Sequence, residues 1–353
     1  MNMCAKEIIG VENSELNRRS FLERGGAVFL AGGASNIGTP PRTQHSPDNQ
    51  LATKGSTLQF FPGFKPVRAQ TTGAIINGVI GGSGPPVLLL HGWPQTHIEW
   101  RKVAPLLAKR FTVVATDLRG YGDSSKPPDG ENHAGYCKRA MARDQVELMQ
   151  QLGFNRFAVV GHDRGGRVAH RMALDYPTTI VQLAVLDIVP TYKLYTTVTR
   201  AFATVYYHWF FLIQPAPLPE TLLGNSAEFF LRNSTLFRGV IPGVITEEAF
   251  AEYLKCFKDP ATLHAMCEDY RAAATIDLDH DKADLDKEIQ CPLLAIWGEK
   301  GAMHRLYDVT ATWKERASNV TGKALPGGHW LPEELPDEVY TELVSFLSPG
   351  PQR

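Results

Sequence analysis

The sequence has few of the features that cross-link a small secreted domain through disulfides or anchor a chain in a membrane. Five cysteines are scattered among 353 residues, and their spacing indicates neither a disulfide framework nor paired metal ligands. No uninterrupted run of roughly 20 apolar residues is present, so we expect no membrane span. The formal net charge is only −1, which gives no electrostatic reason to expect a nucleic acid as a partner.

Signature motifs of metal and cofactor enzymes are also missing. The sequence has no H-E-x-x-H motif, no paired C-x-x-C and no glycine-rich phosphate loop. We therefore expect neither a metal nor an organic cofactor. Hydrophobic residues make up 43% of the chain, which is enough for a substantial core, and the length allows about two domains.

The N-terminal segment is interpreted as a targeting sequence rather than as part of a fold. The stretch from Asn17 to Glu23, with Arg18 and Arg19 at its centre, resembles a twin-arginine export signal, and the weakly apolar run that follows is too short to span a bilayer. Residues 38–54 are rich in Pro, Thr, Ser, Asn and Gln, which is typical of a linker. The motif predicts an exported, periplasmic protein, or a cytoplasmic one if the Arg-Arg pair is accidental.

One stretch in the middle of the chain predicts a catalytic nucleophile. The apolar run from Phe157 to Val160 is typical of a buried strand, and the periodicity from Val168 to Tyr176 is typical of a helix. Gly161-His162-Asp163-Arg164-Gly165 lies between them and has the G-x-S-x-G spacing of a nucleophile elbow, with aspartate at the centre. Glycine tolerates the backbone angles and the close approach of such a turn. We therefore expect Asp163 to be the nucleophile.

Strands and helices alternate along most of the chain. Strands are expected at 67–70, 74–80, 86–90, 111–116, 157–160, 180–186, 291–298 and 319–325, with helices at 98–110, 138–152, 168–176, 309–317 and 338–347. This alternation predicts a mostly parallel central sheet with helices on both faces. It is interrupted by an aromatic-rich segment that we expect to form an inserted helical cap. The predicted organisation is an export signal and linker at 1–55, a core at 56–187 and 284–353, and the cap at 188–283.

Four motifs together resemble the α/β-hydrolase superfamily. Beside the elbow, these are His91-Gly92-Trp93-Pro94, Asp117-Leu118-Arg119-Gly120-Tyr121-Gly122 and Gly328-His329. The resemblance covers nearly everything from about Phe61 onward and implies the α/β-hydrolase fold. Aspartate as nucleophile narrows it to haloalkane dehalogenases, epoxide hydrolases and haloacetate dehalogenases. The run from Gly161 to Arg167, with Leu186-Asp187-Ile188 and His208-Trp209, is most similar to the haloacetate (fluoroacetate) dehalogenases.

The resemblance implies a hydrolytic cycle through a covalent ester. Asp163 would displace halide from a saturated carbon, and His329 would deprotonate the water that hydrolyses the resulting ester. His329 follows the last strand, where the chain order nucleophile, acid, histidine requires the base. His91 is the alternative base. The N–H groups of Trp93 and Arg164 are the expected oxyanion hole.

The acid that orients His329 has two possible places in the sequence. In many α/β-hydrolases it follows the penultimate strand as W-G-x-x-D, but here Gly301 stands where that acid would be. Asp187 ends the strand after the elbow, and we expect it to be the acid. Glu299 and Asp308 are weaker candidates.

Two arginines next to the nucleophile suggest the substrate class. Arg164 follows Asp163 directly and Arg167 is one helical turn on, so both could hold a substrate carboxylate. Haloalkanes have no carboxylate, and the pair therefore favours a haloacid. The alternative is that Arg167 pairs structurally with Asp144 or Asp175.

The resemblance also implies a halide site in the cap. His208, Trp209 and Tyr270 would be the ligands, since each offers an N–H or O–H donor. Tyr253 is the alternative to Tyr270. Trp93 and Trp100 are expected to line the pocket.

The expected function is the hydrolysis of haloacetate to glycolate and halide. The expected partners are the haloacid substrate and water, and the resemblance suggests a homodimer. One alternative is an epoxide hydrolase with the same machinery, in which cap tyrosines protonate the epoxide oxygen. The other is a catalytically inactive α/β-hydrolase that binds a small acid.

Overall fold

The computed structural model describes residues 57–234 and 243–348, so the export motif at Arg18 and Arg19 and the linker lie outside the described residues. In the described part, eight strands form one sheet in the order β1-β2-β4-β3-β5-β6-β7-β8. The strands are β1 (Lys65–Gln70), β2 (Ile75–Gly82), β3 (Pro86–Leu90), β4 (Thr112–Thr116), β5 (Phe157–His162), β6 (Ile180–Leu186), β7 (Leu293–Gly298) and β8 (Val320–Leu325). Only the β1–β2 and β2–β4 pairings are antiparallel. The expected α/β fold with a mostly parallel sheet is confirmed.

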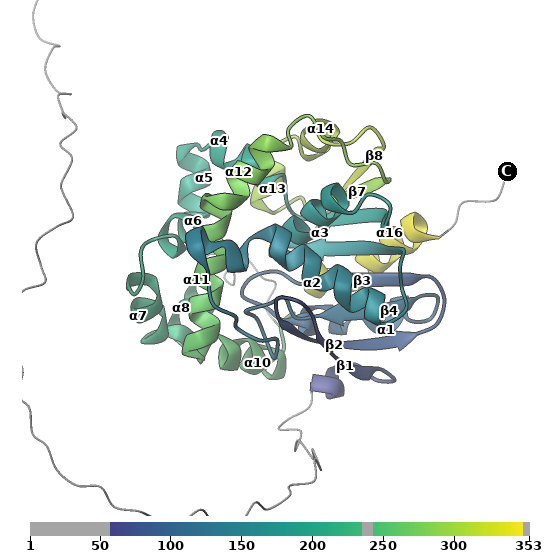
Figure 1. The fold of residues 1–353 in the computed structure, drawn as a ribbon, viewed down its shortest axis with the longest axis horizontal. Helices are drawn as coiled ribbons and strands as arrows, with labels where there is room; N and C mark the ends of the chain where they lie inside the picture. Colours follow the sequence, from purple (N-terminus) through teal and green to yellow (C-terminus); the bar gives the residue numbers. More distant parts are fainter. Residues whose placement is uncertain (1–56, 235–242, 349–353) are drawn as a thin grey trace, which may run out of the picture. The chain divides into compact units, whose positions relative to one another are not determined.

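Alternate residues of the central strands face two separate cores. Leu88 and Leu90 of β3 pack in a core with residues of α2 (Lys138–Gln151) and α3 (Asp163–Asp175). Val87 and Leu89 pack in a second core with residues of α1 (Ala104–Leu107) and α16 (Pro336–Leu347). Figure 1 shows α2 and α3 in front of the sheet. Because both faces are covered, β3 is a continuous apolar run, and each of these side chains contributes roughly 1.5–3 kcal/mol of burial free energy.

The prediction of one long helix at 98–110 is wrong. The chain forms a 3-10 turn, η2 (His97–Arg101), followed by the four-residue helix α1. Pro105 lies in the first turn of α1 and has no N–H to donate to the carbonyl of Arg101. A single helix therefore cannot run through this segment, although its apolar positions still pack against the sheet.

Helices fill the chain between β6 and β7, in the segment that the sequence assigns to a cap. They gather beside one end of the sheet (Figure 1). Most residues of the longest, α11, are buried, and Asp259 caps it by accepting the N–H of Thr262 at 2.7 Å. The helices described here are α4 (Thr191–Thr196), α5 (Arg200–Val205), α6 (Tyr207–Leu212), α7 (Leu218–Gly224), α8 (Ala227–Asn233), α10 (Glu247–Lys258), α11 (Pro260–Ala274) and α12 (Ile276–Ala283).

Three shorter helices follow β7 and β8. They are α13 (Ala302–Leu306), α14 (Val309–Lys314) and α15 (Leu331–Glu334). Of these, only α14 is expected from the sequence pattern. Among the described helices, none combines the length and the hydropathy needed to cross a bilayer.

The turn from β5 into α3 depends on close approach at its two glycines. A Cβ at Gly161 would lie 2.4 Å from the carbonyl oxygen of Gly165, and one at Gly165 would lie 2.4 Å from that of Leu90. The left-handed backbone conformation falls on Asp163 itself, with φ of 43°. Glycine is therefore needed here for space, while the strained backbone angle is held by the aspartate.

Buried contacts of His162 join the end of β5 to η2 and to the loop that carries His329. Nδ1 of His162, at the end of β5, lies 2.8 Å from Oε1 of Glu99 in η2. Nε2 of His162 lies 2.7 Å from the carbonyl oxygen of His329. Burial alone would lower the pKa of His162, but the charge and hydrogen bond of Glu99 outweigh burial and raise the pKa to about 9. A protonated imidazole can donate to both partners at once.

This pair predicts a specific dependence of stability on pH. The folded-state pKa of His162 lies above its ordinary value of 6.5, so the pair contributes fully below pH 6.5 and its contribution is lost as the pH rises through 9. Glu99→Gln should flatten this fall, which we expect to be about 2–4 kcal/mol in the parent. Urea unfolding of both proteins across this range measures the difference. Parallel curves for parent and variant would contradict the assignment.

Candidate active site

The expected catalytic residues lie where strands of the sheet end. Trp93 follows β3, Asp163 follows β5, Asp187 follows β6 and His329 follows β8. Because these strands are parallel, their carboxyl ends meet at one edge, the usual place for a site in an open α/β sheet. The tertiary structure thus brings together residues that are far apart in the sequence.

Asp163 is held as an ionised carboxylate. Its side chain is almost entirely buried, with 5% exposed, and Oδ2 accepts the N–H of Trp93 at 3.2 Å. Burial opposes ionisation, but the neighbouring charges of His329 and Arg167 outweigh it and hold the pKa of Asp163 below its usual value. A carboxylate that stays ionised while nearly dry is suited to nucleophilic attack.

Asp187 contacts the expected base directly. Oδ2 of Asp187 lies 2.6 Å from Nδ1 of His329, and Oδ1 accepts the N–H of Gly298 at 3.1 Å. Asp187 itself has a left-handed backbone, with φ of 51°. This pairing leaves Nε2 of His329 to bind a water molecule, which is the arrangement of a base oriented by an acid.

The position of Gly301 shows why this chain has no acid after the penultimate strand. A Cβ at Gly301 would lie 3.2 Å from Oδ1 of Asp187, so the W-G-x-x-D position and Asp187 converge on the same space. An acid at 301 would collide with the carboxylate that already contacts His329. The two weaker candidates are placed elsewhere, since Glu299 is exposed and Asp308 caps α14 by accepting the N–H of Ala311.

The alternative base, His91, is fully occupied by structural hydrogen bonds. Its Nε2 accepts the N–H of Leu118 at 3.1 Å, and Nδ1 lies 2.8 Å from the carbonyl oxygen of Gly92. Burial lowers its pKa. With both ring nitrogens engaged, His91 has none left to activate water.

Arg164 is fixed along one edge of its guanidinium. Its Nε donates to Oδ2 of Asp269 at 2.9 Å, and Nη2 donates to Oδ1 at 2.6 Å. The remaining nitrogen, Nη1, is buried and has no hydrogen-bond partner within residues 57–234 and 243–348. The guanidinium also lies over the ring of Tyr270, with 4.1 Å from Cζ to the ring centroid.

Arg167 is a buried cation that no carboxylate of the described residues pairs with within 4.0 Å. Only 3% of it is exposed. Nη1 donates to the carbonyl of Val189 at 3.1 Å and to Oγ1 of Thr191 at 3.0 Å, while Nε is left without a partner in this part of the chain. The alternative pairings are not present, because Asp144 pairs with Arg119 and Asp175 with Arg139 and Arg171.

Four rings form an aromatic cluster beside these arginines, namely Trp93, His208, Trp209 and Tyr270. Trp93 stacks on His208 with centroids 5.2 Å apart, and Tyr270 meets Trp209 edge-on at 5.8 Å. Burial lowers the pKa of His208 to about 3, so its ring is neutral at pH 7. Nδ1 of His208, Nε1 of Trp209 and the hydroxyl of Tyr270 are all buried without a partner among the described residues. The cluster therefore offers polar groups to a ligand rather than to the protein.

Tyr253, the alternative to Tyr270, is engaged elsewhere. The hydroxyl of Tyr253 donates to Oε1 of Glu333 at 2.6 Å, which favours Tyr270 for the site. Trp100 packs in the second core with Val87 and Leu107, and its Nε1 is buried without a partner among the described residues. Its role in lining the pocket stays a prediction.

Asp269 is a residue of the site that the sequence analysis missed. Its carboxylate is fully buried and contacts Arg164, the ammonium of Lys138 and the hydroxyl of Tyr121. Burial would raise the pKa of Asp269, but the charges of Arg164 and Lys138 outweigh it and hold the pKa well below the usual range. The available signal was its place directly before Tyr270, which the resemblance assigns to the halide site.

One group of potential metal ligands lies near this charged network. Cys137, Asp277 and His280 have ligand atoms within 4.8 Å of one another. However, Asp277 already accepts the N–H of Lys138 at 2.8 Å and lies 3.3 Å from its ammonium. A lysine cation thus occupies the position next to the carboxylate.

Comparisons with known proteins agree with this geometry. A family model described as the alpha/beta hydrolase fold matches residues 85–336. A fluoroacetate dehalogenase from Burkholderia sp is 48% identical, over 82% of this chain and 95% of the relative. A soluble epoxide hydrolase from Corynebacterium sp. (strain C12) is 37% identical, over 78% of this chain and 96% of the relative.

A solved structure supports the same family. The crystal structure of ALR0039 from Nostoc sp PCC 7120, assigned to the α/β hydrolases, is 57% identical with a TM-score of 0.79, covering 81% of this chain and 98% of that one. The resemblance inferred from the elbow and its companion motifs is confirmed. The chain belongs to the α/β-hydrolase family.

Proposed function

We propose that this protein is a hydrolase acting on carbon–halogen bonds, which converts haloacetate and water to glycolate, halide and a proton. The relative from Burkholderia sp, a fluoroacetate dehalogenase, supports the reaction class. The observation that carries the substrate class is the set of buried, unpartnered polar groups next to Asp163. Arg164 Nη1, Arg167 Nε, His208 Nδ1, Trp209 Nε1 and the Tyr270 hydroxyl all belong to it.

These groups favour a substrate that is a small anion and carries a halogen as its leaving group. A buried cation without a carboxylate partner is costly, and a substrate carboxylate would satisfy Arg167 and Arg164 together. Each guanidinium already donates some of its N–H groups to the protein. The substrate carboxylate would therefore lie between the two arginines and accept from both, rather than form a bidentate pair with one of them. The neutral donors of the aromatic cluster suit a halide, which accepts hydrogen bonds without needing an ion pair.

In the first step, a carboxylate oxygen of Asp163 attacks the carbon that carries the halogen. Oδ2 accepts the N–H of Trp93, which leaves Oδ1 to form the new C–O bond as the carbon–halogen bond breaks. The electron pair leaves with the halide toward His208, Trp209 and Tyr270. The product is an ester on Asp163.

In the second step, His329 takes a proton from water and the resulting hydroxide attacks the ester carbonyl of Asp163. Asp187 stabilises the imidazolium that forms, at 2.6 Å from its Nδ1. The N–H groups of Trp93 and Arg164 would stabilise the oxyanion, a contribution of about 3–4 kcal/mol per donor in comparable sites. Collapse of the intermediate breaks the bond to the glycolate oxygen, which takes up the remaining proton of the attacking water, and restores the Asp163 carboxylate. His329 then releases its proton to solvent.

Incubation with haloacetate and with a simple epoxide separates the three candidate functions. Halide release from haloacetate supports the proposal, and diol formation without halide release would favour an epoxide hydrolase. An epoxide has no carboxylate for Arg164 and Arg167, which is why we favour the haloacid. Binding of haloacetate with neither product would identify an inactive small-acid binder.

Replacing the base should trap the ester. His329→Asn should permit displacement of halide but not hydrolysis, because no group then deprotonates the water. Mass spectrometry after incubation with haloacetate should show a carboxymethyl ester on the peptide that contains Asp163. An adduct on another residue, with Asp163 unmodified, would contradict the assigned nucleophile.

Asp269→Asn should weaken substrate binding through Arg164. The amide cannot hold the guanidinium as an ion pair, so we expect KM for haloacetate to rise by about tenfold or more, with a smaller change in kcat. Breaking a buried pair also lowers the free energy of unfolding by about 3–5 kcal/mol. Steady-state kinetics should therefore be measured at a temperature where circular dichroism shows the variant folded.

Asp144→Asn is the matched control for this variant. Asp144 is equally buried and pairs with Arg119 at 2.5 Å, outside the candidate site. It should lose comparable stability while KM stays close to that of the parent. Equal effects of both variants on KM would show that Asp269 acts only through stability.

Trp209→Phe should discriminate between leaving groups. The variant loses one N–H but keeps an aromatic body next to Arg167. Fluoride leaves carbon reluctantly and depends more than chloride on donors that strengthen in the transition state. We expect kcat/KM for fluoroacetate to fall by about one to two powers of ten, and that for chloroacetate by clearly less. Equal losses would mean that Trp209 only packs.

A further inference from the structure

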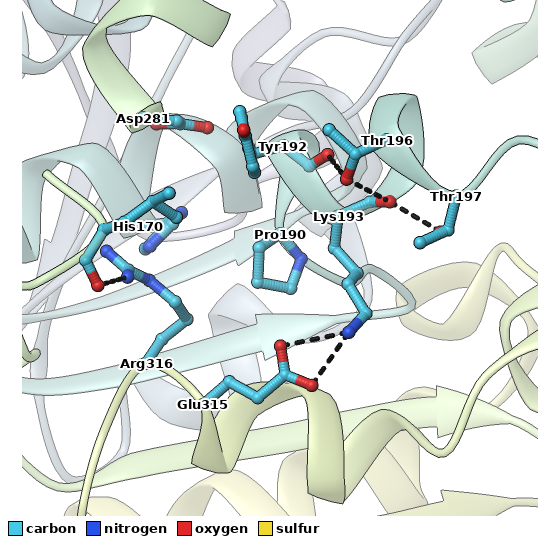
Figure 2. Close-up of a pocket in the computed structure, with 10 residues that line it drawn as sticks. His170, Pro190, Tyr192, Lys193, Thr196, Thr197, Asp281, Glu315 and Arg316 are labelled. Atoms are coloured by element: carbon cyan, nitrogen blue, oxygen red, sulfur yellow. Dashed lines mark hydrogen bonds and ion pairs between the residues drawn. The ribbon is translucent and has the colours of Figure 1, made fainter. Parts of the chain in front are cut away.

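A cavity of about 250 Å³ lies against α3 and includes none of the residues assigned to the candidate active site. Its walls come from the third turn of α3, from α4 and α12 of the cap, and from the end of α14 in the core. Figure 2 shows His170, Pro190 and Tyr192 around it, with Lys193 and Glu315 at one side. The cavity thus spans the boundary between the helices inserted after β6 and the sheet domain.

The charged groups that line this cavity are already hydrogen bonded within the protein. Nζ of Lys193 lies 2.9 and 3.1 Å from the carboxylate oxygens of Glu315 (Figure 2). Asp281 accepts from Arg171 at 2.6 Å. Arg316 has no carboxylate of the described residues within 4.0 Å, but two of its nitrogens donate to the carbonyl oxygens of Leu285 and Asp284 at 2.6 and 2.7 Å. An anionic ligand would have to compete with these carbonyls or with Glu315, and a cationic one with Arg171, so the lining favours a neutral ligand.

The threonine hydroxyl groups in the lining are satisfied as well. Oγ1 of Thr196 donates to the carbonyl of Tyr192 at 2.7 Å, and Oγ1 of Thr197 donates to that of Lys193 at 2.6 Å. Pro190 and Leu285 add apolar surface. Most of the lining therefore offers packing rather than hydrogen bonds.

His170 is the exception. It is 5% exposed, and its Nε2 is buried without a hydrogen-bond partner in the part of the chain that the structure describes. Trp313 holds the ring edge-on, with centroids 5.2 Å apart. Burial, aided by the charges of Arg171 and Arg316, holds the pKa of His170 well below its usual value. The ring is therefore neutral, and Nε2 can donate or accept one hydrogen bond depending on the tautomer.

We propose that this cavity is a second binding site, for a small neutral and largely apolar molecule whose single hydroxyl or carbonyl group hydrogen bonds to Nε2 of His170. A dry cavity of about 150 Å³ can hold benzene, so the volume here suits one substituted ring. The site is independent of the dehalogenase proposal, since none of its residues takes part in that chemistry.

An occupant would connect the cap to the core. It would touch His170 on α3 and Pro190, which lies between the two residues that accept hydrogen bonds from Arg167, Val189 and Thr191. Because the ligand contacts both sides of this boundary only in the folded protein, binding should raise the melting temperature, and the added stability should grow with the logarithm of one plus the ratio of ligand concentration to Kd.

Phenol is a suitable probe, and calorimetric titration is the direct measurement. We expect one saturable site on the full chain, with a Kd of about 1 mM or tighter, and weaker binding of benzoate because its charge has no free partner. Leu285→Trp places bulk at the rim of the cavity and should abolish binding. Leu222→Trp is the matched control, since Leu222 is exposed to a similar degree, 53% against 48%, but lies on α7.

His170→Leu tests the hydrogen bond separately from the cavity. It should lower the ratio of phenol to benzene affinity by about two- to tenfold, the value of one neutral hydrogen bond, while benzene still binds. The proposal is overturned if phenol shows no saturable binding to the parent or binds Leu285→Trp as well as the parent. It is equally overturned if benzoate binds more tightly than phenol, or if the affinity ratio is unchanged in His170→Leu.

Discussion

The buried ion pair between Arg164 and Asp269 determines how the candidate site is built. Arg164 belongs to α3 of the core and Asp269 to α11 of the inserted helices, so the pair joins the two parts next to Asp163, the proposed nucleophile. Lys138 adds a second cation to the same carboxylate. Removing Asp269 would leave the charge of Arg164 buried without a partner, which is far more costly than the pair itself is stabilising. The position of α11 over the sheet is therefore tied to the position of Arg164.

This constraint also orients the polar groups that face a ligand. Asp269 takes the Nε and Nη2 side of the Arg164 guanidinium, and only Nη1 remains. Tyr270, the next residue on α11, then packs beneath the same guanidinium at 4.1 Å. One short segment of α11 thus positions both a proposed carboxylate ligand and a proposed halide ligand. A helix is a more rigid support for such a site than a loop, because its backbone hydrogen bonds fix the positions from which the side chains extend.

The proposed catalytic residues depend on a second constraint, the crowding at the ends of the parallel strands. Glycines at 161 and 165 permit the backbone contacts of the elbow, and Gly301 leaves room for the carboxylate of Asp187. Asp163 and Asp187 both hold left-handed backbone angles, which cost of order 1–3 kcal/mol each. The Glu99–His162 pair holds the surrounding loops together at 2.8 Å. The backbone strain at Asp163 and Asp187 is offset by buried polar contacts around these two residues.

The sequence alone determined the fold class, the elbow and the family, because these depend on local patterns. An apolar run, a glycine spacing and a strand–helix alternation are readable without knowing which segments meet. The break at Pro105 was equally local, although the apolar periodicity of 98–110 obscured it. Only the tertiary structure decided which side chains pair: Asp269 with Arg164, Tyr253 with Glu333, and neither Asp144 nor Asp175 with Arg167. The first two of these pairings join residues 80 or more positions apart, and no sequence period encodes a contact across that distance.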